Sequence, residues 1–319
     1  MESKNNWKAW LYLAPVIILM AVFTFYPILN SFYISFLDNY NYLNGTFDGF
    51  TFDNYIKILT PFIQSGPGSY YEEVMQIALP NTLLLTIITV PISICLALVI
   101  AICLNSIKWF QKIFQTIFFL PYVTNAIAIG MVFAVIFDTD YGVFNAIFGT
   151  ANHPWVTPAY GDPNSKVNYW SAVFALCFYI IWSSLPYKIL IFVGGLQNID
   201  KQYYEAAQVD ATPKWKAAWK ITIPLLSPQI MYVMITSFIG AFKEYDSVIG
   251  LFGTTAGNFD STTGPKNMET MVYFIYSQIS DRATRGGVGL ASAAAVFLFI
   301  IIMIFTALQF WVGKKRVHY

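Results

Sequence analysis

Long stretches without Asp, Glu, Lys, Arg or His dominate the hydrophobic pattern of this chain. Each exceeds the roughly 20 residues that a helix needs to cross a bilayer. Each is also continuous, whereas the strands of a membrane barrel alternate over roughly ten residues. The pattern predicts an all-α membrane protein with six transmembrane helices in one domain, residues 1–319. We place these helices at about 9–37, 74–107, 113–137, 167–196, 221–242 and 286–313.

The first apolar stretch is expected to remain as a helix rather than to be removed. The apolar core of a signal peptide is roughly 7–15 residues long, and a cleavage site with small residues follows it. This stretch is longer and ends in Tyr-Pro-Ile-Leu-Asn at residues 26–30, without such a site.

Composition supports the membrane location and excludes one class of partner. Hydrophobic residues make up 57% of the chain and charged residues 11%, whereas a soluble domain carries about 25% charged residues. Too few polar groups are present to cover a globular surface, so membrane lipid must contact much of the chain. A net charge of only +1 argues against binding to nucleic acid, which we do not expect as a partner.

The distribution of basic residues predicts the orientation in the membrane. The two ends and the connections that follow the second and fourth helices hold 12 of the 18 Lys and Arg residues. Basic residues are enriched on the cytoplasmic side of membrane proteins. Both termini should therefore be cytoplasmic, as an even number of helices requires.

The sequence lacks the patterns that would indicate chemistry on a substrate. It contains neither a phosphate-binding P-loop nor a Gly-x-Ser-x-Gly nucleophile elbow. His153 and His318 are the two histidines of the chain and are far apart in the sequence. We expect no enzyme activity, no metal site and no cofactor in this chain.

The connection between the fourth and fifth helices, residues 188–220, is much longer than the 2–8 residues usual in helix bundles. Residues 201–212 predict a short helix and a turn, and Thr212 and Pro213 suit the N-cap and first residue of a second helix. Two interpretations remain open at this point. The segment is either an interfacial helix anchored by Trp215 and Trp219, or a docking surface where alanines let another protein approach closely.

The same segment resembles a known motif. Glu205-Ala206-Ala207, then position 211, then Ile221-Thr222-Ile223-Pro224 match the spacing of the EAA motif of binding-protein-dependent ABC importers. Ala211 stands where the motif has Gly, and Ile223 stands where it has Leu. Other stretches over residues 7–313 are similar to sugar-type permeases of the maltose and glycerol-phosphate group: Pro80–Leu83, Phe119–Tyr122, Tyr141–Asn145, Gly195–Ile199 and Phe242–Asp246.

This resemblance implies a permease subunit of an ATP-driven carbohydrate importer, with the type I importer fold. It implies a multi-pass protein of the bacterial plasma membrane. The implied partners are a second homologous permease subunit, two ATPase subunits that bind the ATP, and an extracytoplasmic solute-binding protein. The residues implied to couple the permease to its ATPase are Glu205, Ala206, Ala207, Ala211 and Pro224.

The resemblance also indicates where substrate is bound, because the maltose-type relatives use their third and fourth core helices. The polar and aromatic residues at membrane depth on these helices are Tyr122, Asn125, Trp182, Ser183 and Ser184. Aromatic rings can stack on the C–H faces of sugars, while amides and hydroxyls bind sugar hydroxyl groups. The alternative is that the aromatic residues form membrane belts and the polar ones bind neighbouring helices.

Charged residues near the membrane helices are few. Lys243, Glu244 and Asp246, at the outer end of the fifth helix, form either a gate or an ion cluster at the membrane interface. A charged substrate would require an opposite charge at membrane depth. Since Lys188 and Lys243 both lie towards expected helix ends, we favour a neutral carbohydrate over glycerol-phosphate or a uronate.

Two other classes of membrane protein are weighed against an importer subunit. A six-helix secondary transporter would favour internal repeats and carboxylates at mid-membrane, yet the six stretches contain no Asp or Glu. A non-transport assembly protein would not need the EAA spacing in a cytoplasmic loop. Within ABC importers, glycerol-phosphate or another solute is the alternative to a sugar.

Overall fold

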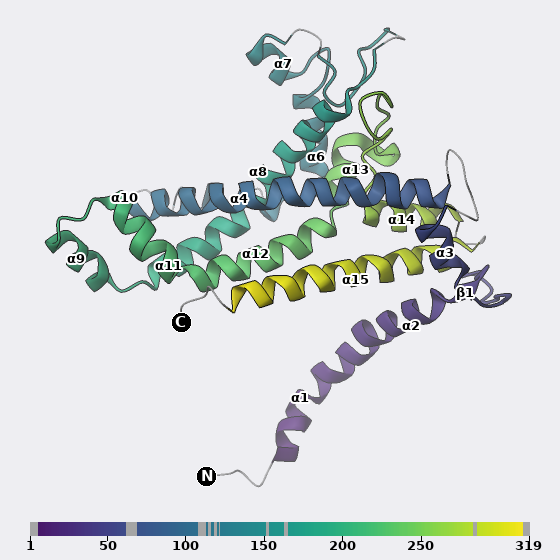
Figure 1. Ribbon diagram of the computed structural model, residues 1–319, viewed down its shortest axis with the longest axis horizontal. Coiled ribbons are helices and arrows are strands. Elements are labelled where there is room, and N and C mark those ends of the chain that lie inside the picture. The colour runs from purple at the N-terminus through teal and green to yellow at the C-terminus, as the bar shows by residue number, and fades with distance from the viewer. Residues whose placement is uncertain are drawn as a thin grey trace. The chain divides into compact units, whose positions relative to one another are not determined.

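The computed structural model describes residues 6–61, 69–107, 113, 116–117, 120, 122–150, 153–162, 165–282 and 286–314. These residues are mostly helical, with one antiparallel pair of short strands, β1 (Leu37–Asp38) and β2 (Gly49–Phe50). The chain divides into two compact units (Figure 1). One comprises Met1–Glu73 and Phe274–Ile300, and the other comprises Val74–Tyr273 and Ile301–Tyr319.

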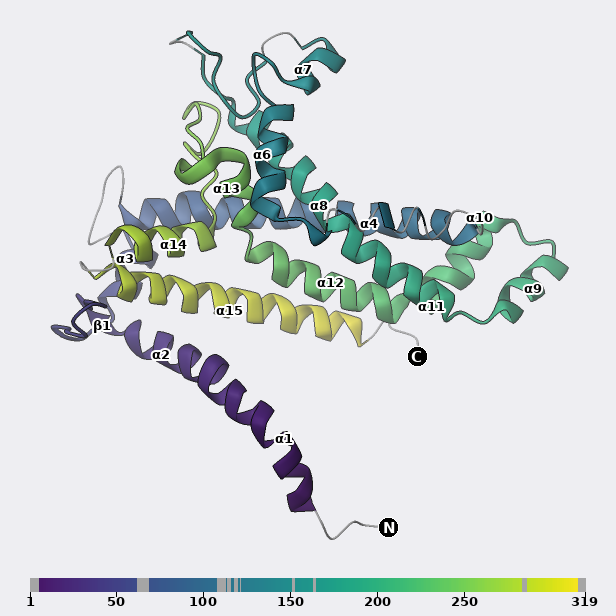
Figure 2. The same ribbon diagram turned by 180° about the vertical axis from the view of Figure 1, so that it is seen from behind.

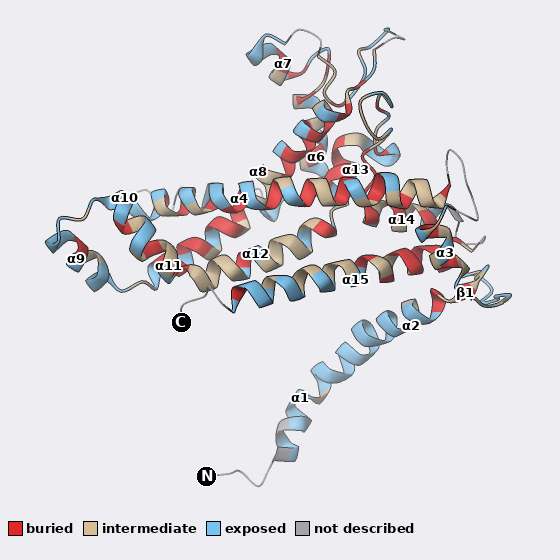
Figure 3. Ribbon diagram, viewed as in Figure 1, coloured by how far each residue is buried: buried red, intermediate tan, exposed pale blue. Residues whose placement is uncertain are grey.

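The first unit contains a long apolar helical rod. The rod consists of α1 (Asn6–Met20), the π-helical segment η1 (Ala21–Phe25) and α2 (Tyr26–Ile34), and none of its described side chains before Ile34 is buried (Figure 3). This surface suits lipid or another apolar protein surface. After the rod, the side chain of Asn54 in α3 (Asp53–Leu59) donates to the carbonyls of Ser35 at 3.1 Å and Leu37 at 2.9 Å.

The second unit is a bundle of crossing helices. In it α4 (Leu79–Ser106) packs against α8 (Tyr169–Gln197) and α12 (Ser227–Phe242), as Figures 1 and 2 show. In the same unit α6 (Ala126–Ile136) packs against α13 (Asp246–Phe252). The remaining helical segments that the structure describes are η2 (Glu72–Ala78), α7 (Val143–Phe148), α9 (Lys201–Val209), α10 (Lys214–Ala217), η3 (Ala218–Thr222), α11 (Ile223–Leu225), η4 (Gly253–Thr255), α14 (Met271–Arg282) and α15 (Gly287–Gly313).

Two hydrophobic clusters hold this bundle together. One surrounds the first half of α8 and includes Leu85 of α4 and Tyr179 of α8. The other surrounds the second half of α8 and includes Ile94 of α4, Phe192 of α8 and Val233 of α12. The two clusters occupy different halves of α8, so the residues between them are not needed for the hydrophobic core and polar side chains can occur there.

Among the described residues, four helices are long and apolar enough to cross a membrane: Trp10–Ile34, Glu72–Ser106, Tyr169–Gln197 and Gly287–Gly313. They agree with the first, second, fourth and sixth expected helices to within three residues at each end. The agreement follows from the scarcity of charged residues in each helix, since a bilayer tolerates few charged side chains along a spanning helix.

The fifth expected helix, 221–242, is not straight. Lys214–Leu225 and Ser227–Phe242 meet at an angle of 68°. Pro224 and Pro228 lie on either side of the bend, and each proline removes a backbone donor and clashes with the preceding turn. The expectation of one continuous helix is therefore wrong here, although the segment as a bent pair remains long enough to span.

The third expected helix, 113–137, is also interrupted. Part of it, including Pro121, lies outside the described residues, and α6 begins only at Ala126. Asn125 has extended backbone angles, φ −66° and ψ 124°, and its side-chain oxygen accepts a hydrogen bond from the backbone N–H of Ala128 at 3.1 Å. Asn125 is thus the N-cap of α6, and an unbroken helix through this residue is wrong.

Two glycines allow α6 and α13 to cross closely. A Cβ atom on Gly130 would lie 2.6 Å from the Cα atom of Gly250, and one on Gly250 would lie 2.9 Å from the Cα atom of Gly130. Only glycine at both positions permits this approach without moving a backbone. The crossing holds α13, and therefore the segment between α12 and α13, against the bundle.

A buried asparagine fixes the first turns of α4. The amide nitrogen of Asn81 donates to the carbonyls of Asn267 at 3.1 Å and Glu269 at 2.9 Å, and its oxygen accepts from the Tyr169 hydroxyl at 2.7 Å. These three bonds join the beginnings of α4 and α8 to the segment after α13. They fix the positions of α4 and α8 relative to each other.

Candidate functional site

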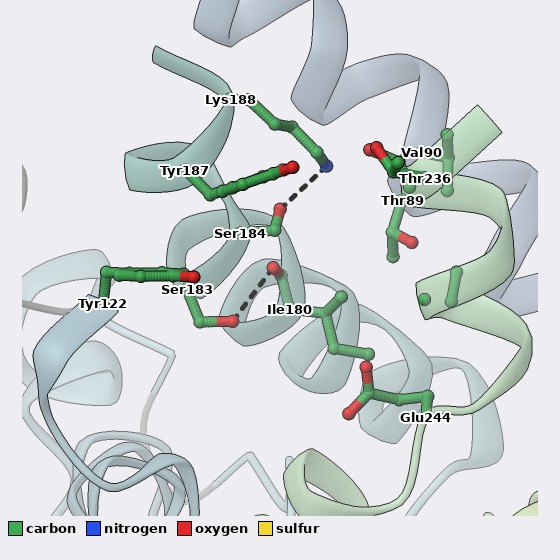
Figure 4. Close-up of a pocket in the computed structure, with 13 residues that line it drawn as sticks. Thr89, Val90, Tyr122, Ile180, Ser183, Ser184, Tyr187, Lys188, Thr236 and Glu244 are labelled. Carbon is green, nitrogen blue, oxygen red and sulfur yellow. Dashed lines mark hydrogen bonds between the residues drawn. The ribbon is translucent and has the colours of Figure 1, made fainter. Parts of the chain in front are cut away.

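A cavity of about 510 Å³ opens between α4, α8 and α12 (Figure 4). Its lining is rich in hydroxyl groups, which come from Thr89, Ser183, Ser184, Thr236 and Ser237. Tyr122, which precedes α6, and Glu244, which follows α12, also line the cavity. The cavity therefore combines parts of the chain that are more than 150 residues apart.

The position of the cavity follows from the polar residues between the two hydrophobic clusters. On α8, the lining residues Ser183, Ser184, Tyr187 and Lys188 come after Ile180 of the first cluster and before Ile189 of the second. Spacings of three and four residues place side chains on one face of a helix. This face of α8 is polar over about two turns, which is unusual at the middle of a membrane helix.

Lys188 is a buried cation in this polar face, with 5% of its surface exposed. Its ammonium group donates to the hydroxyl of Ser93 on α4 and, at 3.1 Å, to the hydroxyl of Ser184 one turn earlier on α8. The two hydroxyls solvate the charge in place of water, which reduces the large cost of burying an ammonium group. Lys188 is thereby fixed as a donor at one end of the cavity.

Glu244 lies at the other end of the cavity and is half-buried. One of its carboxylate oxygens accepts a hydrogen bond from the backbone N–H of Ser247 at 3.2 Å. Its backbone carbonyl accepts from the hydroxyl of Thr270 at 2.7 Å. Both bonds hold the residue at the junction between α12 and α13.

Two tyrosines form an aromatic wall of the cavity. The rings of Tyr122 and Tyr187 are stacked, with centroids 6.0 Å apart and planes at 19°. The hydroxyl of Tyr187 lies 3.1 Å from the hydroxyl of Tyr232 on α12. Aromatic faces next to hydroxyl groups suit a ligand that has both C–H faces and hydroxyl groups.

The predicted substrate residues divide into two groups. Tyr122, Ser183 and Ser184 line the cavity. Asn125 does not, because its side chain caps α6. Trp182 also lies outside the lining and packs on Phe133, with ring centroids 5.2 Å apart.

The charged residues after α12 also divide. Glu244 lines the cavity, whereas Lys243 and Asp246 are exposed and do not. Lys188 was expected near a helix end, but α8 continues for nine residues beyond it. Lys188 therefore belongs to the membrane-spanning part of the chain and not to the loop that follows.

Among the polar lining residues, sequence reasoning missed Thr89, Tyr187, Lys188, Thr236 and Ser237. One signal was available on the second helix, where Thr82, Thr86, Thr89 and Ser93 recur at helical spacing in an apolar stretch. On α12, no comparable spacing distinguishes Thr236 from residues that merely contact lipid. Among the described residues, no three His, Cys, Asp or Glu side chains are close enough to hold a metal ion.

A second feature of this unit is the pair of helices α9 and α10 after the end of α8 (Figure 1). The side chain of Asp200 caps α9 by accepting a hydrogen bond from the N–H of Gln202 at 3.0 Å. At the other end, the N–H groups of Ala211 and Thr212 donate to the carbonyls of Gln208 at 3.0 Å and Ala207 at 2.9 Å. This is the Schellman motif that commonly ends a helix.

The turn after α9 has the left-handed backbone that a glycine would favour. Ala211 has φ 51°, so the departure from the EAA pattern strains the turn without abolishing it. The second helix begins one residue later than expected, because Pro213 is its N-cap and Lys214 its first residue.

The exposed face of α9 is mixed polar and apolar. Glu205, Ala206 and Val209 are exposed, and Val209 has 86% of its surface accessible. Ala207 is buried, with only 9% exposed, so the expectation that both alanines are open to a partner is wrong for Ala207. The helix periodicity turns Ala207 to the inner side of the loop, where the Tyr204 hydroxyl also lies 3.0 Å from that of Thr222.

Apolar helices of spanning length, a polar cavity among them and a helical loop after α8 define a membrane permease. The chain belongs to the family of binding-protein-dependent transport system inner membrane components, whose family model matches residues 93–318. The family is one of transport permeases and not of enzymes, as expected, and its members are multi-pass membrane proteins. A secondary transporter and an assembly protein are thereby set aside.

Relatives match over nearly the whole chain. The lactose transport system permease protein LacF of Rhizobium radiobacter is 31% identical over 97% of this chain and 95% of its own length. The sn-glycerol-3-phosphate permease UgpA of Agrobacterium fabrum is 28% identical over 99% and 97%, respectively. The multiple sugar-binding transport system permease MsmF of Streptococcus mutans is 27% identical over 98% and 97%.

Solved structures share the fold. A bacterial ABC transporter involved in the import of the acidic polysaccharide alginate matches with a TM-score of 0.72 at 18% identity, over 99% of this chain and 98% of that chain. The alginate ABC transporter in complex with alginate pentasaccharide-bound periplasmic protein matches with a TM-score of 0.73 at 17% identity, over 98% and 96%. These likenesses confirm the type I ABC importer permease fold.

Proposed function

We propose that this chain is one of two permease subunits of a carbohydrate importer and that the α4–α8–α12 cavity forms part of the substrate path. The observation that supports it most is the cavity itself, because hydroxyls and stacked tyrosines line a space between apolar helices. The relatives point the same way, since LacF and MsmF are named for lactose and sugar transport.

The partners follow from the family. A second, homologous permease subunit supplies the rest of the path, and a solute-binding protein delivers substrate from outside. Two ATPase subunits bind and hydrolyse ATP on the cytoplasmic side, and this chain holds no cofactor of its own. With Lys188 assigned to the membrane, the basic residues divide eleven to six in favour of the side that contains both termini, which are therefore cytoplasmic.

The cytoplasmic loop supplies the mechanical connection. The exposed face of α9, formed by Glu205, Ala206 and Val209, meets the ATPase, where the Glu205 carboxylate pairs with a basic residue. Movement of α9 reaches α12 through α10, η3 and α11, which follow one another along the chain. Since α12 contributes Thr236 and Ser237 to the cavity, a shift of the loop changes the shape of the cavity.

Reconstitution tests this function directly. The purified importer, with both permeases and both ATPases in proteoliposomes, should hydrolyse ATP faster when its binding protein and radiolabelled lactose are present, and should accumulate the label. If neither a neutral sugar nor a mixture of plant oligosaccharides is transported by an importer that responds to its binding protein, the carbohydrate assignment is wrong.

The orientation has a separate test in intact cells. Cys95, Cys103 and Cys177 are first replaced by Ala, and a single cysteine is then placed at Tyr42 or Val209, two exposed positions. A membrane-impermeant thiol reagent should label position 42 from outside and position 209 only after the cells are opened. Labelling of position 209 in intact cells would overturn both the topology and the coupling role of α9.

A second candidate substrate is a phosphorylated polyol. Lys188 places a cation in the cavity, and UgpA is named for sn-glycerol-3-phosphate transport. Competition by sn-glycerol-3-phosphate for uptake in the reconstituted importer would favour this candidate over a neutral sugar.

A further inference from the structure

We propose that Glu244 and Lys188 are specificity-determining residues that act in series, so that Glu244 excludes anions, Lys188 excludes cations, and uncharged polyhydroxylated substrates pass. The inference rests on the proposed substrate path and names the chemical class that the path accepts. Among the described residues that line the cavity, Lys188 and Glu244 are the two charged side chains.

Lys188 is held so that one donor is left for a ligand. Its two serine partners already donate their own protons to backbone carbonyls, Ser93 to Thr89 at 2.6 Å and Ser184 to Ile181 at 3.0 Å. Both hydroxyls must therefore accept from the ammonium group. An ammonium group has three N–H donors, so the third remains for an oxygen in the cavity.

Glu244 is held so that its carboxylate faces the cavity as an acceptor. One carboxylate oxygen accepts the hydrogen bond from the N–H of Ser247 at 3.2 Å, which offsets part of the cost of burying the charge. Figure 4 shows the carboxylate directed towards Ile180, at the opposite end of the lining from the ammonium group of Lys188.

The two charges lie one after the other along the path. Ile180 and Lys188 are eight residues apart on α8, which corresponds to about 12 Å along the helix axis. Because α8 runs towards the cytoplasmic loop, Glu244 is at the outer end of the cavity and Lys188 at the inner end. An incoming anion meets a carboxylate first, and a cation that passes Glu244 meets the ammonium group next.

The expected strength of each barrier is moderate. A unit charge about 12 Å from another, at an effective dielectric constant of about 20, changes an equilibrium or a rate by roughly tenfold. A neutral polyol feels neither repulsion and can hydrogen-bond at both ends. The positive charge of Lys188 and the negative charge of Glu244 together leave the cavity without net charge. A neutral substrate is therefore compatible with the buried ammonium group of Lys188.

The electrostatic part is tested with a cysteine inside the cavity. In the permease chain whose Cys95, Cys103 and Cys177 are replaced by Ala, purified with cysteine-free partner subunits in detergent, Ser183→Cys provides a thiol on the lining. Its rates of modification by anionic sulfonatoethyl and cationic trimethylammonioethyl methanethiosulfonate are compared as a ratio. Glu244→Gln should raise the anion-to-cation ratio at least tenfold, Lys188→Gln should lower it at least tenfold, and the double variant should restore it.

Matched controls separate this effect from misfolding and from surface charge. Lys243→Gln removes an exposed charge next to Glu244 and should leave the ratio unchanged, and Lys188→Arg should do the same because it keeps the charge. A thiol at Val209, outside the cavity, should show no change in any variant. Equal ratios in wild type, Glu244→Gln and Lys188→Gln would overturn the proposal.

The substrate class is tested on the same thiol by protection. Galactose should slow the modification of the Ser183→Cys thiol by a neutral reagent when Glu244 and Lys188 are both present, whereas galacturonate and galactosamine should not. Galacturonate should become protective in Glu244→Gln, and galactosamine in Lys188→Gln. Equal protection by all three sugars with both charges present would overturn the charge filter. If the anion-to-cation ratio shifts in the variants as expected but no sugar protects the thiol, the proposed substrate path would instead be refuted.

Discussion

The cytoplasmic loop and the membrane cavity are built in opposite ways. The loop from Asp200 to Thr222 is made of consecutive residues, and its cap and turn are closed by hydrogen bonds between residues no more than five apart. The cavity takes side chains from α4, α8 and α12 and from the segments that precede α6 and follow α12. Its most informative contact, from Lys188 to Ser93, joins residues 95 positions apart.

This difference separates two kinds of function. A docking surface can be specified by a short sequence, because its shape depends on local helix geometry and on which residues face outwards. A substrate cavity depends on how distant helices cross, so its chemistry appears only when the bundle is assembled. Mutations in the loop should therefore affect partner binding and leave the bundle intact, whereas mutations at helix crossings should affect the bundle itself.

Ala206→Arg in the loop is expected to have the largest effect on transport. Ala206 is exposed beside Glu205 on α9, and a long charged side chain there would prevent close approach of the ATPase. We expect loss of ATPase copurification and a fall in uptake of at least a hundredfold, with normal amounts of permease in the membrane. Quantitative blots of the membrane and of the purified complex provide the measurement.

The control for this variant is Lys214→Ala, which removes an exposed charge from α10 without adding bulk to α9. It should retain the ATPase and most of the uptake. Normal copurification of the ATPase with Ala206→Arg would contradict the assignment of this face as the contact. Ala207→Arg is a poorer test, because Ala207 is buried in the loop and its replacement would disturb the loop itself.

Gly130→Ala tests the helix bundle, where the structure depends on how distant helices cross. The new Cβ atom would lie 2.6 Å from the Cα atom of Gly250, and relief requires a shift of the α6 or α13 backbone. We expect a loss of about 3 kcal/mol of stability, seen as a lower melting temperature of the solubilised permease. Gly194→Ala, at a helical glycine with nothing within 4 Å of the added atom, should change the melting temperature little, and equal effects would refute the tight crossing.

The sequence allowed prediction of four spanning helices because each contains a long stretch without charged residues. It did not reveal the bend at Leu226 or the break at Asn125, since proline and asparagine are compatible with more than one local geometry in a helical context. The EAA spacing located the coupling helix, but which alanine faces outwards depends on how α9 folds back towards α10. Tyr122, Ser183 and Ser184 were recognised as polar residues on apolar helices.

The role of Lys188 was beyond sequence reasoning for a different reason. Its charge made it resemble the start of a loop, and its solvation by Ser93 depends on the crossing of α4 and α8. Glu244 was recognised as a charged residue near a helix end, yet its separation from its neighbours Lys243 and Asp246 results from the turn between α12 and α13. For Lys188 the deciding contact is long-range, whereas for Glu244 it is a turn whose course the sequence pattern did not reveal.

Asn125→Ala distinguishes a helix cap from a substrate ligand. As the N-cap of α6, Asn125 satisfies the N–H of Ala128, and its loss should cost about 1 kcal/mol of stability. The melting temperature of the solubilised permease should fall slightly, and uptake at saturating substrate should not change. Asn125→Asp, which keeps a capping oxygen, should restore the melting temperature. A tenfold loss of uptake with unchanged melting would instead return Asn125 to the substrate path.

The smallest effect is expected at Ala211, where the locally built loop itself holds strain. A non-glycine residue at φ 51° costs roughly 1–2 kcal/mol. Replacement by glycine removes this strain, but it also increases the conformational entropy of the unfolded chain, which cancels part of the stabilisation. Ala211→Gly should therefore stabilise the turn by about 0.5 kcal/mol. Hydrogen exchange at the Thr212 N–H, which donates to Ala207 across the turn, should slow about twofold. Ala211→Val, whose branched side chain fits this backbone poorly, should speed the same exchange, and faster exchange in the glycine variant would show that the turn is not strained by alanine.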